Sequence, residues 1–171
     1  MNTTQCIRRL CCRLCNSSEL ELVIQLTPTP PANAFVKSNR VEVEQNVYPL
    51  DIFFCKNCSH VQLLDVIDPK ILFSEYVYVS GTSPLFVEHF RRYASDILTQ
   101  FTPRVGSLVV DIGSNDGTLL SFFKKAGMSV LGIDPARKIV EEANRNKIET
   151  LEGFFNQSLA ENILVSKGPA S

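Results

Sequence analysis

The sequence predicts an α/β chain in which a small, loop-rich, metal-binding domain is followed by the first half of an open parallel sheet. Three observations predict this fold. Two Cys-x-x-Cys pairs lie in a region rich in Pro, Asn and Ser. From residue 107 onward, strand-like and helix-like segments alternate with short connections, which is typical of a parallel sheet. A turn containing two glycines, residues 111–117, follows the first of these strands.

Composition excludes several classes of protein. The chain has 171 residues, of which 44% are hydrophobic and 20% charged, as in a packed globular protein. The 17 basic and 18 acidic side chains give a formal net charge of −1, which leaves no positive excess for binding nucleic acid. Apolar runs such as residues 52–55 are too short to span a membrane, and the first residues do not form a secretory signal. We therefore expect a cytoplasmic protein whose six cysteines are reduced or bind metal.

The first 80 residues, predicted as the zinc-binding domain, contain only short stretches of strand character. Residues 20–24 are one such stretch, and residues 41–44 alternate apolar and acidic side chains, as in a strand with one face in water. Residues 48–54 and 60–64 flank the second cysteine pair and are expected to form a hairpin. Because so small a sheet buries little surface, we expect a metal to stabilise it.

The cysteine pairs predict a structural zinc site. In a Cys-x-x-Cys turn both sulfurs can face one point, so Cys12, Cys15, Cys55 and Cys58 supply four thiolates in a tetrahedron with no open position. The spacer is longer than the about 15–20 residues of common zinc ribbons, but loop-closure entropy grows slowly with length. Iron bound as in rubredoxin, plain reduced core thiols, and Cys11 in place of Cys12 are alternatives. We prefer Cys12 because its spacing mirrors that of the second pair.

Residues 81–103 are predicted to form a connecting amphipathic helix, and residues 104–171 a partial sheet domain. Ser83 is a suitable N-cap before Pro84, apolar residues recur at helical spacing, and Thr102-Pro103 ends the helix. The expected strands beyond it are 107–112, 129–133 and 148–151, and the expected helices are 118–126, 135–146 and 158–165.

The turn at residues 111–117, Asp-Ile-Gly-Ser-Asn-Asp-Gly, is expected to face a nucleotide-like ligand. Gly113 allows a sharp turn with its backbone close to the ligand, and Gly117 allows a close helix–strand contact. Asp134 ends the next strand, where a carboxylate can accept hydrogen bonds from ribose hydroxyls. The alternative is an ordinary strand–helix connection that binds nothing.

The residues of the turn also indicate which nucleotide to expect. A dinucleotide site needs G-x-G-x-x-G, but Asn115 and Thr118 occupy the second and third glycine positions, and a P-loop lysine is absent. Asp111 leads the turn, and its charge repels a pyrophosphate but attracts the cationic sulfonium and amino group of S-adenosylmethionine. Electrostatics therefore favours S-adenosylmethionine over NAD at this Rossmann-like turn.

Short motifs that cover nearly the whole chain carry a resemblance to a known family. They are CRLC (12–15), PANAF (31–35), YPLD (48–51), CKNC (55–58), VQL (61–63), YVYVS (76–80), TS (82–83), His89, DIGSNDG (111–117) and GFF (153–155). Together they resemble the N-terminal part of the sugar C-methyltransferases. These S-adenosylmethionine-dependent enzymes join an N-terminal zinc-binding domain to a class I methyltransferase domain and a further domain. The turn Gly-Ser-Asn-Asp-Gly is this family's own version.

The resemblance implies a role for each matching residue. The zinc ligands implied are Cys12, Cys15, Cys55 and Cys58. The residues implied around S-adenosylmethionine are Asp111, Gly113, Ser114, Asn115 and Gly117 at the methionine part, Asp134 at the ribose, and Phe154 and Phe155 at the adenine. Tyr76 and Tyr78 are implied to face the substrate. The two phenylalanines and the two tyrosines are equally well explained as buried packing residues.

The implied reaction is methylation of the carbon beside the ketone of a nucleotide-linked keto-deoxysugar. A base removes a proton from that carbon, and the resulting enolate attacks the sulfonium methyl group. No residue of this sequence is identified as the base. Because enzymes of the family are much longer, we expect this chain to be a fragment that lacks one wall of the cofactor cleft and is inactive alone.

The same interpretation predicts an exposed sheet edge. Residues 108–110 of the first strand are expected to self-associate, since the strand that would cover them is not part of the expected sheet. Two other functions remain open from the sequence. One is a non-enzymatic zinc-ribbon module that binds another protein, and the other is an NAD-dependent enzyme, which Asn115 disfavours.

Overall fold

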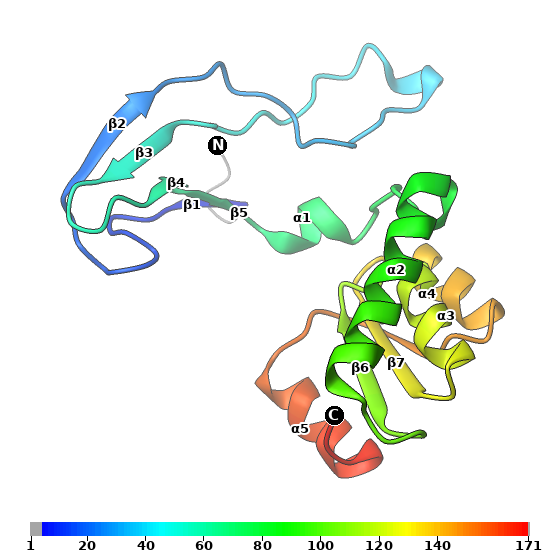
Figure 1. The fold of residues 1–171 in the computed structure, drawn as a ribbon. Helices are drawn as coiled ribbons and strands as arrows, with labels where there is room; N and C mark the ends of the chain where they lie inside the picture. The colour runs from blue at the N-terminus through cyan, green and yellow to red at the C-terminus, as the bar shows by residue number, and fades with distance from the viewer. Residues whose placement is uncertain (1–4, 171) are drawn as a thin grey trace. The chain divides into compact units, whose positions relative to one another are not determined.

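The computed structural model describes residues 5–170, and the chain divides into two compact units between Leu72 and Phe73. Figure 1 shows the elements of both units, which are described separately below. Within the described residues, the helices are too short or too polar to cross a membrane.

The first unit contains two small antiparallel sheets (Figure 1). The three-stranded sheet has the order β2 (Leu20–Ile24), β3 (Ile52–Cys55) and β4 (Val61–Leu63), and the two-stranded sheet pairs β1 (Cys6–Arg8) with β5 (Asp65–Ile67). The expected hairpin around the second cysteine pair is confirmed, because Phe54 of β3 pairs with Val61 of β4. The sequence does not predict β1 and β5.

Few side chains of the first unit are buried. The buried ones are Cys12, Tyr48, Cys55, Gln62 and Leu64. Large apolar side chains lie on the surface instead, and Leu10 and Phe35 are 83% and 80% exposed. The core is therefore centred on cysteines, and apolar burial alone contributes little to the stability of this unit.

The expected strand at residues 41–44 is wrong. A 3₁₀ helix, η1 (Ser38–Arg40), leads into a turn, in which the N–H of Val43 donates to the carbonyl of Arg40. Val41 is 65% exposed. Alternating side chains suit a strand only where a partner strand accepts its hydrogen bonds, and in the described residues this segment bonds to its own turn.

The second unit begins within α1 (Pro69–Phe73) and continues through η2 (Ser80–Thr82) and the long helix α2 (Pro84–Phe101). The predicted cap of α2 is confirmed, since the Ser83 hydroxyl accepts from the N–H of Phe86. The elements that follow are β6 (Leu108–Ile112), α3 (Thr118–Lys125), β7 (Ser129–Asp134), α4 (Arg137–Arg145), β8 (Thr150–Glu152) and α5 (Gln157–Lys167).

The second unit is a three-layer arrangement. Its strands are parallel in the order β6-β7-β8, so α3 and α4 are the crossover connections between them. On one face, Val130 of β7 packs with Ala94, Leu120, Phe123 and Ala143 from α2, α3 and α4. On the other face, Leu131 and Ile133 pack with Ile163 of α5. The alternation of neighbouring strand residues between the two faces produces these layers.

Strand β6 lies at the edge of this sheet, as predicted. Beyond α5, Ala170 forms a parallel bridge to Leu108 on the side of β6 away from β7. Leu108 is buried, and Val109 and Val110 are partly buried. The apolar side chains of β6 therefore face the helices, and what is open at this edge is chiefly backbone.

Candidate functional sites

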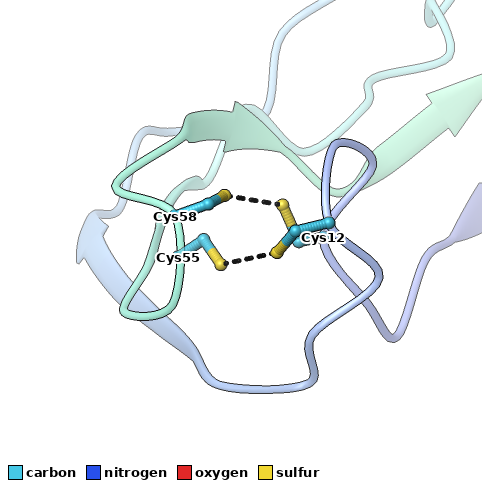
Figure 2. Close-up of side chains that lie close together, drawn as sticks. Cys12, Cys55 and Cys58 are labelled. Carbon is cyan, nitrogen blue, oxygen red and sulfur yellow. Dashed lines mark hydrogen bonds between the residues drawn. The ribbon is translucent and has the colours of Figure 1, made fainter.

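The four predicted cysteines lie together in the first unit (Figure 2). Their sulfur atoms are all within 4.8 Å of one another, with 3.7 Å between Cys12 and Cys58 and 3.6 Å between Cys15 and Cys55. In a tetrahedral site with Zn–S bonds of about 2.3 Å, the sulfurs are separated by about 3.8 Å. The geometry therefore fits one zinc ion, and the cluster contains Cys12 rather than Cys11.

The two Cys-x-x-Cys turns have the same backbone geometry. In the first, the Cys12 carbonyl accepts from the N–H of Asn16, and in the second the Cys55 carbonyl accepts from the N–H of Ser59. Asn16 and Ser59 both have left-handed backbones, with φ of 60° and 61°. The N–H groups of Cys12 and Cys55 each donate to the carbonyl five residues on. Two equivalent turns thus present their sulfurs to a single point.

The neighbouring sulfurs and nearby hydrogen bonds shift the pKa values of the clustered thiols in opposite directions. Burial raises the pKa of Cys12, but hydrogen bonds from the backbone of Cys15 and Leu14 outweigh it and lower that pKa to about 6. A backbone hydrogen bond at His60 lowers the pKa of Cys58, but burial and the neighbouring sulfurs raise it to about 12. Four adjacent thiolates repel one another, so a divalent cation is needed for all of them to ionise.

Gln62 connects β4 to the first cysteine turn. Its side chain is buried, and its Oε1 accepts from the backbone N–H of Arg13 at 3.0 Å. The guanidinium of Arg13 in turn donates to the carbonyl of Leu63. These bonds hold the first turn against the sheet that carries the second.

The second unit contains a pocket of about 350 Å³ at the carboxyl ends of β6 and β7. The lining residues are Phe73, Tyr76, Ile112, Gly113, Asn115, Ile133, Asp134, Pro135, Gly153, Phe154 and Phe155. The volume lies within the range of small-molecule sites. The wall is mainly apolar and aromatic, with a carboxylate and a glycine turn as its polar features.

At Gly113 the backbone borders the pocket without a side chain to cover it. Its φ is +77°, and an added Cβ would meet no atom within 4 Å. Its N–H donates to the carbonyl of Ile133, which fixes the turn to β7. Because a side chain here would be strained and would fill free space, glycine leaves room for a ligand beside the main chain.

Asp134 is the polar centre of the pocket. Its side chain is buried, with the two carboxylate oxygens accepting from the backbone N–H groups of Asn115 at 3.0 Å and Ala136 at 2.9 Å. Each oxygen keeps a second lone pair, which a ribose hydroxyl can use. Burial, and then the charge of Asp134, raises the pKa of the Asp111 carboxyl. This pair of acids favours a cationic ligand.

The structure brings together only part of the residue set that the resemblance implies. Gly113, Asn115, Asp134, Phe154, Phe155 and Tyr76 line the pocket, whereas Asp111, Ser114, Gly117 and Tyr78 are not among its lining residues. Gly117 instead packs against Ile148, where an added Cβ would lie 2.7 Å from a side-chain carbon. Ser114 is buried, and its hydroxyl has no hydrogen-bond partner among the described residues.

Sequence reasoning missed five lining residues: Phe73, Ile112, Ile133, Pro135 and Gly153. Four of them adjoin predicted residues, so the ends of the strands contained a signal for them. Phe73 had none, because it lies at the end of α1, distant in sequence from the strands that carry the pocket.

The described residues thus combine a sulfur cluster of zinc geometry with a glycine turn at the end of a parallel strand. Comparison with known proteins adds what the chain is similar to. Residues 12–73 match the family described as a putative zinc binding domain. The chain is 31% identical over 159 residues to the C-methyltransferase NovU of Streptomyces niveus, covering 93% of this chain and 38% of that protein. The chain is therefore similar to a C-methyltransferase over most of its own length, and it spans less than half of the length of that relative.

A solved structure is also similar to part of the chain. It is a putative S-adenosyl-L-methionine-dependent methyltransferase from Methanococcus maripaludis, with 25% identity and a TM-score of 0.37. The similarity covers 41% of this chain and 36% of that one.

The zinc-binding family match and the four-cysteine geometry both support zinc as the bound metal.

Proposed function

We propose that this chain supplies the zinc-binding domain and the cofactor-binding half of an S-adenosylmethionine-dependent C-methyltransferase. The substrate class we propose is a nucleotide-linked keto-deoxysugar, on the strength of the motifs shared with the sugar C-methyltransferases. The observation that carries the proposal is the pocket in which an open glycine turn, a buried carboxylate and two phenylalanines converge.

The residues present fit S-adenosylmethionine. Asp134 is placed to accept from the ribose hydroxyls, and Phe154 and Phe155 offer aromatic surface for the adenine ring. The buried carboxylate of Asp134 and the partly buried carboxylate of Asp111 favour the sulfonium charge. When bound, S-adenosylmethionine supplies an electrophilic methyl group. The lining residues at the carboxyl end of β6 would hold the cofactor that carries this group.

The zinc site has a structural role in this proposal. The four sulfurs would leave a bound zinc ion no coordination position for water or substrate, so Cys55 and Cys58 at the end of β3 and in the turn after it would be tied to the first cysteine turn without taking part in chemistry. The unit's small apolar core makes this contribution necessary.

Calorimetric titration of the zinc-loaded chain with S-adenosylmethionine tests the proposal. We expect saturable binding to the parent chain and to Glu149→Ala, which removes an exposed carboxylate that is not among the lining residues of the pocket. Asp134→Asn should weaken binding by at least tenfold, and NAD should give no heat. If the zinc-loaded chain binds no S-adenosylmethionine, the competing interpretation of a zinc-ribbon module that binds another protein is favoured instead.

A further inference from the structure

The side chain of Asn115 bonds to a distant stretch of the second unit. Its Oδ1 accepts from the N–H of Ser80 at 2.9 Å, and its Nδ2 donates to the carbonyl of Tyr78 at 2.9 Å. A carbonyl and the N–H two residues on are the groups that one strand offers to a single residue of its neighbour in a parallel ladder. The amide of Asn115 therefore substitutes for a strand, and both of its polar ends are used.

The next residue of the turn bonds to the same stretch. Asp116 accepts from the N–H of Gly81 at 2.9 Å through Oδ2, and from the N–H of Thr118 at 3.1 Å through Oδ1. One carboxylate thus joins Gly81 to the first turn of α3. The contact is close, because a Cβ on Gly81 would lie 2.5 Å from Asp116 Oδ2.

The stretch held in this way continues into the wall of the pocket. Tyr76 lines the pocket together with Phe73, and the rings of these two residues lie 6.1 Å apart, edge to face. Tyr76 and Tyr78 form a second edge-to-face pair at 6.4 Å. A bond to the backbone of Tyr78 therefore constrains where the ring of Tyr76 lies.

We propose that Asn115 and Asp116 are positioning residues, whose side chains hold residues 78–81 and so set Tyr76 on the pocket wall. This inference rests on the proposed function, in which Tyr76 is the residue expected to face the substrate. It assigns to the Asn115 side chain a task other than the cofactor contact that the resemblance implies. It also explains why the turn departs from G-x-G, because a glycine at residue 115 has no side-chain amide to donate or accept hydrogen bonds.

Asn115→Gly separates the holding of residues 78–81 from contact with the cofactor. Asn115 has a φ of +52°, which glycine adopts without strain, and its N–H to Asp134 is a backbone bond that survives the change. The variant therefore keeps the turn and loses only the two bonds to residues 78 and 80. Its affinity for S-adenosylhomocysteine is measured beside that of the parent chain as a second readout.

Amide hydrogen exchange in the 171-residue chain is the decisive readout. In the parent chain the N–H groups of Ser80 and Gly81 are bonded to side chains, so they should exchange slowly. Asn115→Gly should speed exchange at Ser80 at least tenfold, and Gly81→Ala should do the same at both positions by displacing Asp116. Ser80→Ala is the matched control, because only the backbone of this residue is used, and it should leave exchange at both positions unchanged.

Each result supports or overturns the inference independently of the proposed function. Unchanged exchange in Asn115→Gly overturns it, and loss of S-adenosylhomocysteine binding with unchanged exchange assigns Asn115 to the cofactor instead. If neither chain binds S-adenosylhomocysteine, the proposed function fails, while the exchange data still decide whether Asn115 holds residues 78–81.

Discussion

The carboxylate of Asp134, at the end of β7, accepts a hydrogen bond from the backbone N–H of Asn115, in the turn that follows β6. Its other oxygen accepts from the N–H of Ala136, just before α4. One buried carboxylate thereby joins the ends of two strands and the start of a helix. The residue proposed to bind ribose therefore also holds the pocket in shape.

This double role predicts that Asp134 contributes to stability. Asp134→Ala leaves two backbone N–H groups without their acceptor, and we expect the free energy of unfolding to fall by about 2 kcal/mol or more. Asp134→Asn keeps one acceptor oxygen and should lose less. Urea denaturation followed by circular dichroism measures both, with the exposed Asp96→Ala as a control. An Asp134→Ala chain as stable as the parent would show that the two bonds contribute nothing.

The choice between neighbouring cysteines is directly testable. Cys12→Ala removes one of the four clustered sulfurs, so the purified chain should lose most of its zinc. Cys11→Ala removes a thiol outside the cluster and should keep one zinc per chain. Elemental analysis of the two purified variants decides this. The reverse pattern, with zinc retained in Cys12→Ala only, would mean that Cys11 is the ligand.

Gly117 and Gly106 form a matched pair for the packing of the glycine turn. Both have left-handed backbones, with φ of +77° and +84°, but a Cβ at Gly117 would meet Ile148 at 2.7 Å whereas one at Gly106 meets no atom within 4 Å. Gly106→Ala introduces backbone strain without a clash and should lower the free energy of unfolding by about 1 kcal/mol. Gly117→Ala adds a clash to that strain and should lower the free energy of unfolding by about 2–4 kcal/mol. Thermal unfolding of the two variants measures the difference, and equal costs would argue against the close contact with Ile148.

Asp111 should reduce stability at neutral pH. Burial, and then the charge of Asp134, raises the pKa of its carboxyl above the ordinary 3.8, because both disfavour the ionised form in the folded chain. The ionised side chain therefore destabilises the fold above its folded-state pKa, and this effect disappears as the pH falls below 3.8. We expect Asp111→Asn to be more stable than the parent at pH 7, with a difference that shrinks toward pH 4.

Denaturation of the Asp111→Asn and parent chains across this pH range checks the direction of the stability difference and its change with pH. A difference that grows as the pH falls would contradict the assignment. In the same variant, S-adenosylmethionine should lose affinity relative to S-adenosylhomocysteine, which lacks the sulfonium charge, because the negative charge proposed to favour the sulfonium is gone.

Features with a local signature could be predicted from the sequence. The four cysteines were identified from spacing alone, because each Cys-x-x-Cys turn determines the placement of its own two sulfurs. The order of strands and helices from Pro84 onward was also predicted, since Ser83 caps α2 and the apolar periodicity is clear. Asp134 could be placed at the end of β7 because strand ends are marked by the change from apolar to polar residues.

Features that depend on distant partners could not be predicted. The alternation at residues 41–44 suits a strand, but the sequence does not show that the segment bonds to its own turn. Strands β1 and β5 are three residues each and pair across a long separation, so neither has a periodicity of its own. The hydrogen bonds from the side chain of Asn115 to residues 78 and 80 could not be predicted for the same reason, because nothing near Asn115 in the sequence indicates its partners.

The most direct measurement of cofactor binding is an amide NMR titration of the zinc-loaded chain with S-adenosylhomocysteine. We predict saturable chemical-shift changes at Gly113, Asn115 and Gly153, which line the pocket, and little change in β2, β3 and β4. No change at these three amides under saturating ligand, or changes confined to the zinc-binding unit, would contradict a cofactor site at the end of β6.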